Sequence, residues 1–454
     1  MEKPDRMELF RSAPVPKAVM KNALPSMAAM LMVLVYNLAD TFFISLTKND
    51  YQVAAVSMVM PVFLIMMAVG FVFGIGGTSV ISRALGEERL EYAKKVCAFC
   101  FWSCIVMGMV LGTIYLVFIE QILKWMGTSS ETYGLAKTYL TITACSAPVV
   151  LVANCYSHIV RAEGFAGKAM AGQLLGNILN IILDPIMILS FRWGIAGAAI
   201  ATVIGNVFSA GYYILHFLRG KSALSIHPKE FTLRNKVCSS VLAIGVPASL
   251  GSLIMCVSQI TLNSLMSTFN DMAVAGIGVA GKVLQITTMV SIGFGQGVQP
   301  LLGFCVGARL WGRFKKVMRF SVVMALLISS AMTICCLILD EQLVSIFLTE
   351  KAAFDYALQF VRILLTTSWL FGAFYVFTNS LQAAGAAKSA LIINISRQGL
   401  IYIPSLFILK SLIGIRGLAW AQPVADVLST TLVIILFVIT IRQLMKKHPE
   451  HVSL

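Results

Sequence analysis

Charged residues are scarce in this chain. Asp, Glu, Lys and Arg make up 12% of its 454 residues, whereas 58% of them are hydrophobic. Soluble globular domains contain about 25% charged residues, so the composition excludes a soluble domain. The apolar residues form continuous runs and do not alternate with polar ones, which indicates that the spanning segments are helices. The composition therefore predicts an all-α integral membrane protein.

Motifs of enzymes and of nucleotide-binding proteins are also missing. The sequence contains no G-x-S-x-G, no nucleotide-binding loop, and no cluster of His, Cys and Glu at metal-ligand spacing. The ten cysteines are scattered, and the C-x-x-C formed by Cys97 and Cys100 lies in an apolar run without further ligands. We therefore expect packing cysteines, no enzyme activity, no resident cofactor and no metal or redox site at these cysteines.

Twelve apolar runs are long enough to cross a bilayer, which takes about 20 helical residues. In the first half they lie near 15–45, 53–84, 92–119, 132–162, 166–190 and 194–219. In the second half they lie near 236–268, 273–307, 316–339, 352–384, 388–411 and 415–444. The longest polar stretch away from the termini, 220–235, joins the two halves, so we expect lobes of residues 1–222 and 223–454.

The two halves repeat each other weakly at an offset of 221 residues. The residues that recur are Gly74, Gly76, Gly86, Lys94, Lys95 and Val96, which match Gly295, Gly297, Gly307, Lys315, Lys316 and Val317. A half-chain repeat in an apolar protein is typical of transporters, in which two similar bundles enclose a site near the membrane midplane. The repeat predicts two pseudo-symmetric six-helix bundles.

The net charge of +15 does not indicate binding to nucleic acid. With twelve spans, most of the 35 Lys and Arg fall in the loops of one side, such as Lys94 and Lys95 after the second run and Lys316 after the eighth. Cytoplasmic loops have this excess, so both termini are expected in the cytoplasm, where the same residues would attract anionic lipids. We see no cleaved signal peptide, and expect a monomer in a bacterial inner or plasma membrane.

Two acids lie within apolar runs of the first half, where a charge is costly and usually functional. Asp40 lies in VLVYNLADTFFI, four residues after Tyr36, so the two share a helix face. Asp184 lies in LGNILNIILDP and shares a face with Asn177 and Asn180. Because no basic residue lies near Asp40 in the sequence, a functional role is favoured over a structural ion pair.

Further amides and hydroxyls of the first half can join these acids. Thr202 and Asn206 lie four residues apart in the sixth run, and Asn154 lies in the fourth. Carboxylates among such groups in a dry bundle can hold a proton, or can surround a hard cation such as sodium with oxygen ligands. Near the cytoplasmic end of the fourth run, His158 and Glu163 are expected to be solvated or to anchor a loop.

The second half has no acid at the matching positions. Its polar residues within the apolar runs include Asn263, Lys282, Arg397 and Asp426, which we take, with Asn177 and Asn206, as candidates for a substrate cavity. Arg397 and Asp426 could instead form a buried structural ion pair. The asymmetry between the halves predicts that ion coupling belongs to the first.

Together these residues resemble a family, the multidrug and toxic compound extrusion (MATE) transporters. The matching stretches are NLAD ending at Asp40, SRALGE, RAEG and LNIILDP in the first half, and GFGQGVQPLLGFCVGA, LQAAG and GLAWAQPVAD in the second. The resemblance covers nearly the whole chain. The contexts of Arg397 and Asp426 look most like the branch that includes the MepA exporters, with DinF-like relatives near.

The resemblance implies a secondary active exporter of organic cations and amphipathic drugs, driven by inward movement of protons or sodium. It implies a cation-coupling site made of Tyr36, Asp40, Asn154, Asn180, Asp184 and Thr202. A bound sodium ion would then lie at Asp40, Asn180, Asp184 and Thr202. The alternative is a flippase of the same superfamily for lipid-linked or anionic cargo, which should have a strongly basic cavity.

Overall fold

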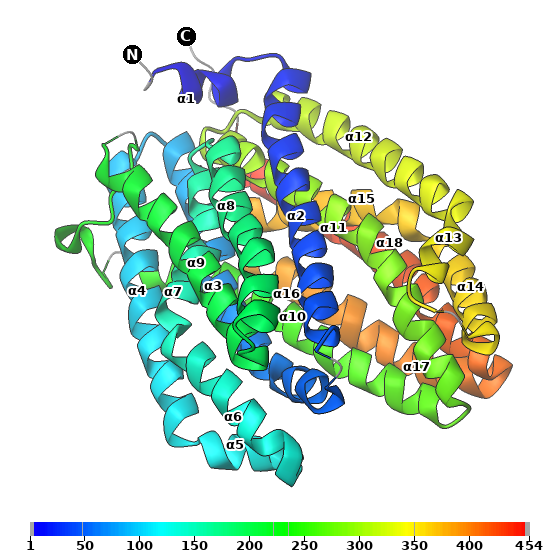
Figure 1. The fold of residues 1–454 in the computed structure, drawn as a ribbon. Helices are drawn as coiled ribbons and strands as arrows, with labels where there is room; N and C mark the ends of the chain where they lie inside the picture. The colour runs from blue at the N-terminus through cyan, green and yellow to red at the C-terminus, as the bar shows by residue number, and fades with distance from the viewer. Residues whose placement is uncertain (1–3, 48, 221, 235, 349, 450–454) are drawn as a thin grey trace. The chain divides into compact units, whose positions relative to one another are not determined.

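The computed structural model describes residues 4–47, 49–220, 222–234, 236–348 and 350–449, which are mostly helical and include no strand (Figure 1). Within these residues, ten helices are long and apolar enough to cross a membrane. Two further pairs of helices, each joined at a bend, bring the number to twelve if each pair is counted as one span. The predicted all-α membrane fold is therefore confirmed, and the ten to twelve candidate spans agree with the twelve apolar runs of the sequence.

The first half of the chain contains α1 to α9. Their bounds are α1 (Pro4–Arg11), α2 (Val15–Ser45), α3 (Asp50–Gly86), α4 (Leu90–Val117), α5 (Ile119–Trp125), α6 (Ser130–Cys145), α7 (Ala147–Ala162), α8 (Ala166–Pro185), the π-helix η1 (Ile186–Ser190) and α9 (Gly194–Leu218). The linker contains the short 3₁₀ helix η2 (Pro228–Glu230).

The second half repeats this order. Its elements are α10 (Val237–Ser267), α11 (Asp271–Gly307), α12 (Trp311–Ile338), α13 (Asp340–Ser345), α14 (Lys351–Leu365), η3 (Ser368–Leu370), α15 (Phe371–Ala383), α16 (Ala387–Ile395), the π-helix η4 (Ser396–Ile401), α17 (Tyr402–Ile413) and α18 (Ile415–Lys447).

The fourth span of each half is broken, which the continuous apolar runs do not show. α6 and α7 meet at a bend of 59°, and α14 and η3–α15 meet at a bend of 42°. At the first bend, Pro148 lies in the first turn of α7. Proline is tolerated there but would interrupt a continuous helix, since it has no N–H and its ring clashes with the preceding turn.

The contacts between residues divide the chain into two units. Unit 1 comprises Met1–Leu31 with Leu250–Leu454, and unit 2 comprises Met32–Ser249. These units share most of their residues with the lobes expected at 1–222 and 223–454, which stay a prediction based on the repeat. The difference lies in α2 and α10, each of which contributes its first part to one unit and its second part to the other.

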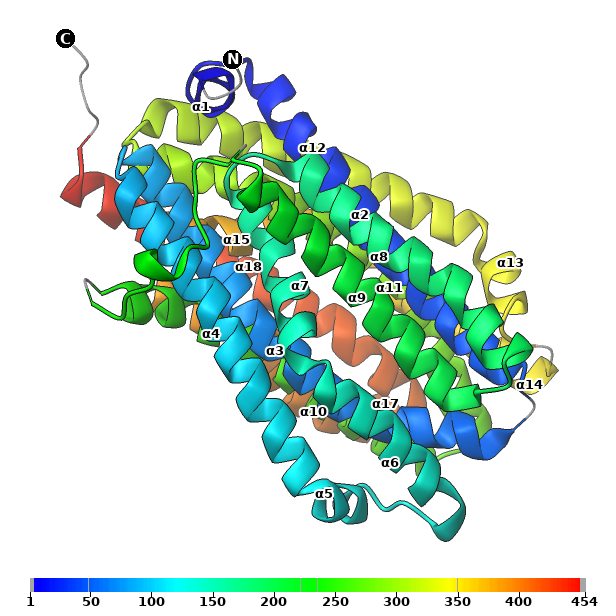
Figure 2. The same cartoon turned by 60° about the vertical axis from the view of Figure 1, so that its left-hand side comes forward.

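Glycines allow α8 and α9 of unit 2 to run side by side in close contact (Figures 1 and 2). A Cβ placed on either Gly176 or Gly205 would lie 2.6 Å from the backbone oxygen of the other. Further along the same helix pair, the Tyr213 hydroxyl donates to the Ala169 carbonyl at 2.8 Å. Small residues at such contacts are how helices pack in lipid, where the hydrophobic effect does not drive association.

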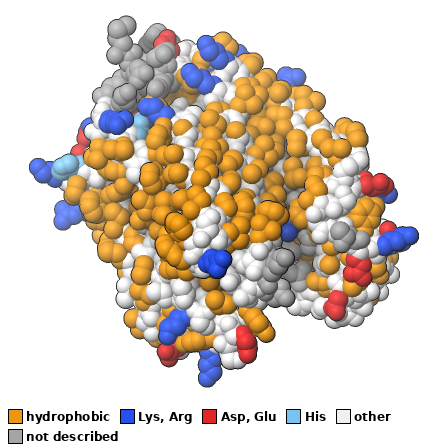
Figure 3. Space-filling view, viewed as in Figure 1, with side chains coloured by type: hydrophobic (Ala, Val, Ile, Leu, Met, Phe, Trp, Pro, Cys, Tyr) orange, Lys and Arg blue, Asp and Glu red, His pale blue; other side chains and the backbone are white. Residues whose placement is uncertain are grey.

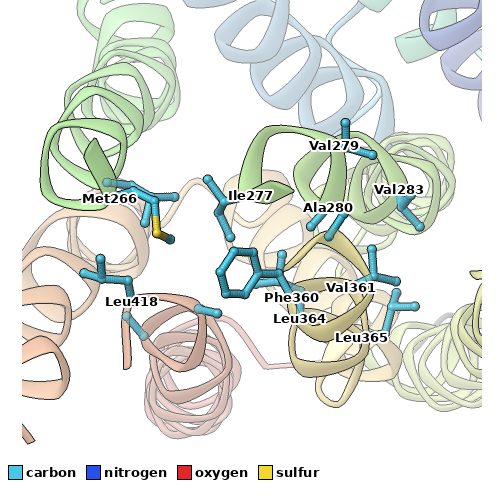
Figure 4. Packing of buried hydrophobic residues seen from close by; sticks show 14 of the residues in the cluster. Met266, Ile277, Val279, Ala280, Val283, Phe360, Val361, Leu364, Leu365 and Leu418 are labelled. Atoms are coloured by element: carbon cyan, nitrogen blue, oxygen red, sulfur yellow. The ribbon is translucent and has the colours of Figure 1, made fainter. Parts of the chain in front are cut away.

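An apolar core joins α10, α11, α14 and α18 within unit 1. Figure 4 shows Phe360 of α14 facing Ile277 of α11, with Met266 of α10 and Leu418 of α18 nearby, and these four side chains and Leu364 of α14 are buried. Van der Waals contact between such side chains is a main source of cohesion in a membrane bundle.

The outer surface is apolar, as lipid requires. Hydrophobic side chains cover most of the face shown in Figure 3, and the charged side chains visible there lie mainly toward its margins. On α4, for example, Val106, Met109 and Val117 are each at least half exposed. In water such a surface would cause aggregation. With the apolar spans, it identifies a multi-pass membrane protein.

Candidate functional site

A polar group links α8 and α9 in the middle of unit 2. With the Asn180 amide turned to the orientation in which both of its ends are bonded, its nitrogen donates to Asp184 Oδ2 at 3.2 Å, and its oxygen accepts from the backbone nitrogen of Thr202 at 3.0 Å and from its hydroxyl at 3.2 Å. All three residues are buried, and Asp184 is fully buried. The structure therefore brings together three of the residues assigned to cation coupling, and one asparagine connects the carboxylate to the neighbouring helix.

The local sequence explains this placement. The contact between Gly176 and Gly205 brings α8 against α9, and Asn180 lies one turn beyond Gly176 on the same face of α8. Pro185 then follows Asp184 directly, and the chain continues as the π-helix η1. Proline donates no hydrogen bond to the preceding turn, and π-helical turns occur frequently at functional sites. Asp184 thus lies where regular α-helical hydrogen bonding ends.

The other predicted acid, Asp40, lies on the second part of α2 in the same unit. Asp40 and Asp184 are near enough to interact electrostatically, and Tyr36 interacts with both acids and with the Thr202 side chain. Asp40 Oδ1 and Asp184 Oδ1 are both buried and have no hydrogen-bond partner among the described residues. A buried charge without a partner is costly, so each carboxylate is suited to take up a proton or a cation.

Tyr139 of α6 belongs to this group, although it was not among the residues predicted for the site. Its side chain is buried and interacts electrostatically with Asp40 and Asp184. The signal was present in the sequence, since Tyr139 is a tyrosine among threonines within an apolar run, much as Tyr36 lies beside polar residues in its own run. What the sequence could not show is that α6 and α2 bring the two tyrosines to one site.

Three amides assigned from the sequence have other positions. The Asn154 nitrogen donates to Val150 O at 2.9 Å, and the Asn206 nitrogen donates to Thr202 O at 2.8 Å, so both bind the backbone of their own helices. Asn177 has a buried amide nitrogen that has no hydrogen-bond partner in the described residues. No hydrogen bond joins Asn154 to Asp40 or Asp184 within the described part of the chain, and its coupling role stays a prediction.

Arg397 and Asp426 form the buried ion pair that the sequence suggested. Arg397 Nε donates to Asp426 Oδ1 at 3.0 Å, and its Nη1 donates to the Tyr375 hydroxyl at 2.9 Å. The guanidinium carbon also lies 4.6 Å from the ring centre of Phe374 and 4.9 Å from that of Phe371. Such cation–π contacts stabilise a desolvated guanidinium.

Asp426 has partners for both carboxylate oxygens, unlike Asp40 and Asp184. Gln422 donates to its Oδ1 at 2.8 Å, and Thr367 donates to its Oδ2 at 3.4 Å. The arginine and the two further donors offset part of the cost of burying the carboxylate charge, and removing one partner of such a pair is strongly destabilising. This arrangement favours a structural role for Arg397 and Asp426 over a place in a substrate cavity.

The other candidates of the second half are more exposed. Lys282 and Asn263 both have exposed side chains, and the Lys282 ammonium lies 4.9 Å from the ring centre of Phe347. In unit 2, Glu163 accepts hydrogen bonds from the Ser222 hydroxyl and the Ala223 backbone nitrogen, which confirms that it anchors a loop. Of the two roles expected for His158, the solvated one is wrong, because its ring is buried against Phe71.

The fold and the paired carboxylates define a membrane transporter built from two related halves. Comparison with known proteins agrees. The family model MatE matches residues 25–186 and again 247–408, which is the repeat predicted from the glycines. The chain belongs to the MatE family, the multidrug and toxic compound extrusion transporters.

Two groups of relatives support this assignment. The multidrug export protein MepA of Staphylococcus aureus strain MRSA252 is 31% identical over 424 residues, which are 93% of this chain and 94% of that protein. MepA of Staphylococcus haemolyticus is 30% identical over 93% of both chains. Thus the chain is similar over nearly its whole length to multidrug exporters.

Solved structures show the same fold. A MATE protein in complex with MaL6 superposes with a TM-score of 0.93 at 24% identity, covering 97% of this chain and 99% of that one. An outward-facing multidrug resistance MATE transporter of the MOP superfamily gives the same TM-score at 23% identity, with the same coverage. The predicted MATE fold is therefore confirmed.

Proposed function

We propose that this protein is a secondary active multidrug exporter, which expels organic cations and amphipathic drugs by antiport with protons or sodium ions. It belongs to a family of multidrug export transporters, and MepA, to which it is similar, is named a multidrug export protein. Asp40 and Asp184 are proposed to couple the driving ion to export. The proposed setting is a bacterial plasma membrane, in which the protein acts as a monomer.

The contrast between the acids of the two halves is the observation that supports this proposal most. Asp40 and Asp184 each have a buried carboxylate oxygen that has no hydrogen-bond partner among the described residues, whereas Asp426 is bonded through both oxygens. An acid without full partners changes its interaction energy strongly when a cation or proton arrives. An acid that is already paired with an arginine gains little interaction energy from binding a cation or a proton.

The residues around Asp40 and Asp184 also suit a sodium ion. Hard cations are bound by carboxylate, amide and hydroxyl oxygens, and the site offers two carboxylates with the Thr202 hydroxyl close by. The Asn180 oxygen joins this set only when its amide rotates to turn the oxygen toward Asp184. A proton would need only one of the carboxylates. The donor set therefore fits either driving ion.

Ion binding can drive export because Asp40 and Asp184 lie on different helices. With both acids ionised, their mutual repulsion favours an arrangement in which α2 and α8 hold them apart. Neutralising the charge removes that preference, and α2 is free to bend or shift. The cycle requires only that the ion and the drug bind the two conformations with different affinities.

The flippase alternative is not favoured. Its cargo would require a strongly basic cavity, but the guanidinium of Arg397 is hydrogen-bonded to Asp426 and Tyr375. Lys282 is the other cation that the sequence placed within the apolar runs of the second half, and its side chain is exposed. Asn177, Asn206 and Asn263 remain the proposed polar contacts for drugs.

Efflux from proteoliposomes tests the proposal. The purified protein is reconstituted, and export of a fluorescent organic cation is followed under a pH gradient and under a sodium gradient imposed separately. Asp40→Asn and Asp184→Asn should each abolish ion-driven export. Asp355→Asn, which removes an exposed acid on α14, is the matched control and should transport normally.

The two gradients separate the driving ions. Export under the pH gradient without sodium would identify protons, and export under the sodium gradient alone would identify sodium. Unchanged export by Asp40→Asn under both gradients would exclude the proposed coupling site. If the unmodified protein translocates a fluorescent lipid-linked sugar but no organic cation, the flippase function holds instead.

A further inference from the structure

Arg313, near the start of α12, binds the end of α1 through its guanidinium. Its Nε donates to Phe10 O at 2.7 Å, and its Nη2 donates to Ala13 O at 2.7 Å and to Leu9 O at 3.2 Å. The last carbonyls of a helix have no partners within the helix and lie at the negative end of its dipole. The planar fork of arginine binds several such acceptors at once, which a lysine cannot do.

Apolar contacts support the same junction. The side chains of Leu9 and Phe10 are buried, and the Phe10 ring lies 5.6 Å from that of Phe304 near the end of α11. The short helix α1 is therefore held by unit 1 through both its backbone and its side chains. The chain passes from this junction directly into α2 at Val15.

The first part of α2 is fixed to α11 in turn. A Cβ on Gly297 would lie 2.6 Å from Ala23 Cα, and a Cβ on Gly293 would lie 2.7 Å from Met27 Cα, so the two backbones are in close contact. The part of α2 from Met32 onward groups with unit 2 instead, and it includes Tyr36 and Asp40. Helix α2 thus has its first part in unit 1, whereas its second part, with Tyr36 and Asp40, lies in unit 2.

We propose that Arg313 is a positioning residue for transport, which fixes the start of α2 so that movement of its Asp40 end is transmitted to unit 1. A helix that is free at one end responds to a local force by rotating or sliding as a whole. When its start is held at Leu9–Ala13 and along α11, the same force displaces the helices of unit 1. This inference rests on the proposed function, because it assumes that ion binding at Asp40 moves α2.

Two features distinguish Arg313 from the other Lys and Arg residues that the sequence places in loops on the cytoplasmic side. Lys315 and Lys316 on the same helix have exposed side chains, as expected of residues that act through charge alone. At the repeat offset of 221 residues, the position that matches Arg313 holds Tyr92, so the first half has no equivalent cation. Arg313 therefore makes a contact that is explained neither by the repeat nor by the excess of Lys and Arg in cytoplasmic loops.

The test separates drug binding from turnover in the full-length protein. Arg313→Ala should lower the maximal rate of ion-driven efflux about tenfold, within the usual range of coupling between sites, while the Kd of the fluorescent cation changes less than about twofold. Arg313→Lys keeps the positive charge but loses the planar guanidinium that binds several carbonyls. Its efflux rate should therefore lie between those of the unmodified protein and of Arg313→Ala. Lys316→Ala, the matched control, should transport like the unmodified protein.

Hydrogen exchange shows whether the junction itself has opened. Amides of α1 and of the first turns of α2 should exchange faster in Arg313→Ala, whereas those of α8 and α9 should not change. Phe10→Ala removes the ring contact and leaves the guanidinium in place, so it should give the same defect in turnover. Because the two changes break one junction, the double variant should be no worse than about the more severe single variant.

Several outcomes would overturn the inference. Faster exchange in α1 with normal turnover would show that the junction is irrelevant to transport, and unchanged exchange would show that Arg313 does not hold α1. A loss of drug affinity equal to the loss of rate would indicate general damage to the fold. If the unmodified protein transports in the same experiment, a failure of the Arg313 inference can be told apart from a failure of the proposed function.

Discussion

Asn180 and Asp184 lie one turn apart on α8, and the orientation of the Asn180 amide that bonds both of its ends places its nitrogen 3.2 Å from Asp184 Oδ2. The hydrogen bond orients the carboxylate and leaves Asp184 Oδ1 buried with no hydrogen-bond partner among the described residues. Asn180 also accepts from Thr202, so the acid on α8 is held in place from α9. The geometry of the site thus depends on a side chain that has no charge of its own.

Replacing Asn180 with leucine should therefore impair coupling. Leucine preserves the size of the side chain but donates nothing to Asp184, and a hydrogen bond to a charged group contributes about 1.5–3 kcal/mol. That loss corresponds to a fall of about tenfold or more in ion-driven efflux, measured in proteoliposomes at matched protein amounts. Thr202→Ser, which retains the hydroxyl, should stay active, whereas Thr202→Val should not. Normal efflux by Asn180→Leu would contradict the assignment.

Two glycines of α9 should respond differently to the same small change. A Cβ on Gly205 would lie 2.6 Å from Gly176 O, whereas a Cβ on Gly211 would have no atom within 4 Å. Gly205→Ala should separate α8 from α9 and destabilise the protein by about 1–3 kcal/mol, the usual cost of overpacking. Gly211→Ala should be neutral or slightly stabilising. Thermal unfolding in detergent measures both, and equal melting temperatures would refute the proposed helix contact.

The ion pair between Arg397 and Asp426 should contribute to stability and not to ion coupling. Asp426→Asn leaves a buried guanidinium without its counter-charge, which should cost about 3–5 kcal/mol of stability. The double variant Arg397→Met with Asp426→Leu removes both charges and should recover most of that loss. Thermal unfolding of the single and double variants gives the comparison. A fully stable Asp426→Asn protein that no longer responds to the ion gradient would instead place Asp426 in the coupling site.

The sequence predicted the fold well because membrane spans are long and apolar, and because lipid leaves few alternatives to helices. It did not predict the breaks of the fourth spans. Pro148 was visible at one of them, but a proline in an apolar run fits a kinked helix as well as a broken one. The second break, between Leu365 and Ser368, contains no proline at all.

The site was predicted in part for a related reason. Asn180 and Asp184 share a helix face, and the i, i+4 spacing reveals this without a structure. Tyr139 was missed because its relation to Asp40 depends on how α6 packs, and spacing along one helix contains no such information. Nothing in the sequence singled out Arg313 for the same reason, since the Ala13 carbonyl that it binds is 300 positions away in the chain.

The exchange of helix segments between the two units has a consequence for the origin of the repeat. Neither half of the chain, cut at the linker, would contain a complete unit, because the first part of α2 groups with the second half and the first part of α10 with the first. An ancestor with a single copy of the repeat, built on the same plan, would have formed a domain-swapped dimer in which each subunit lent the start of its first helix to the other. Gene duplication would then have made that exchange permanent within one polypeptide.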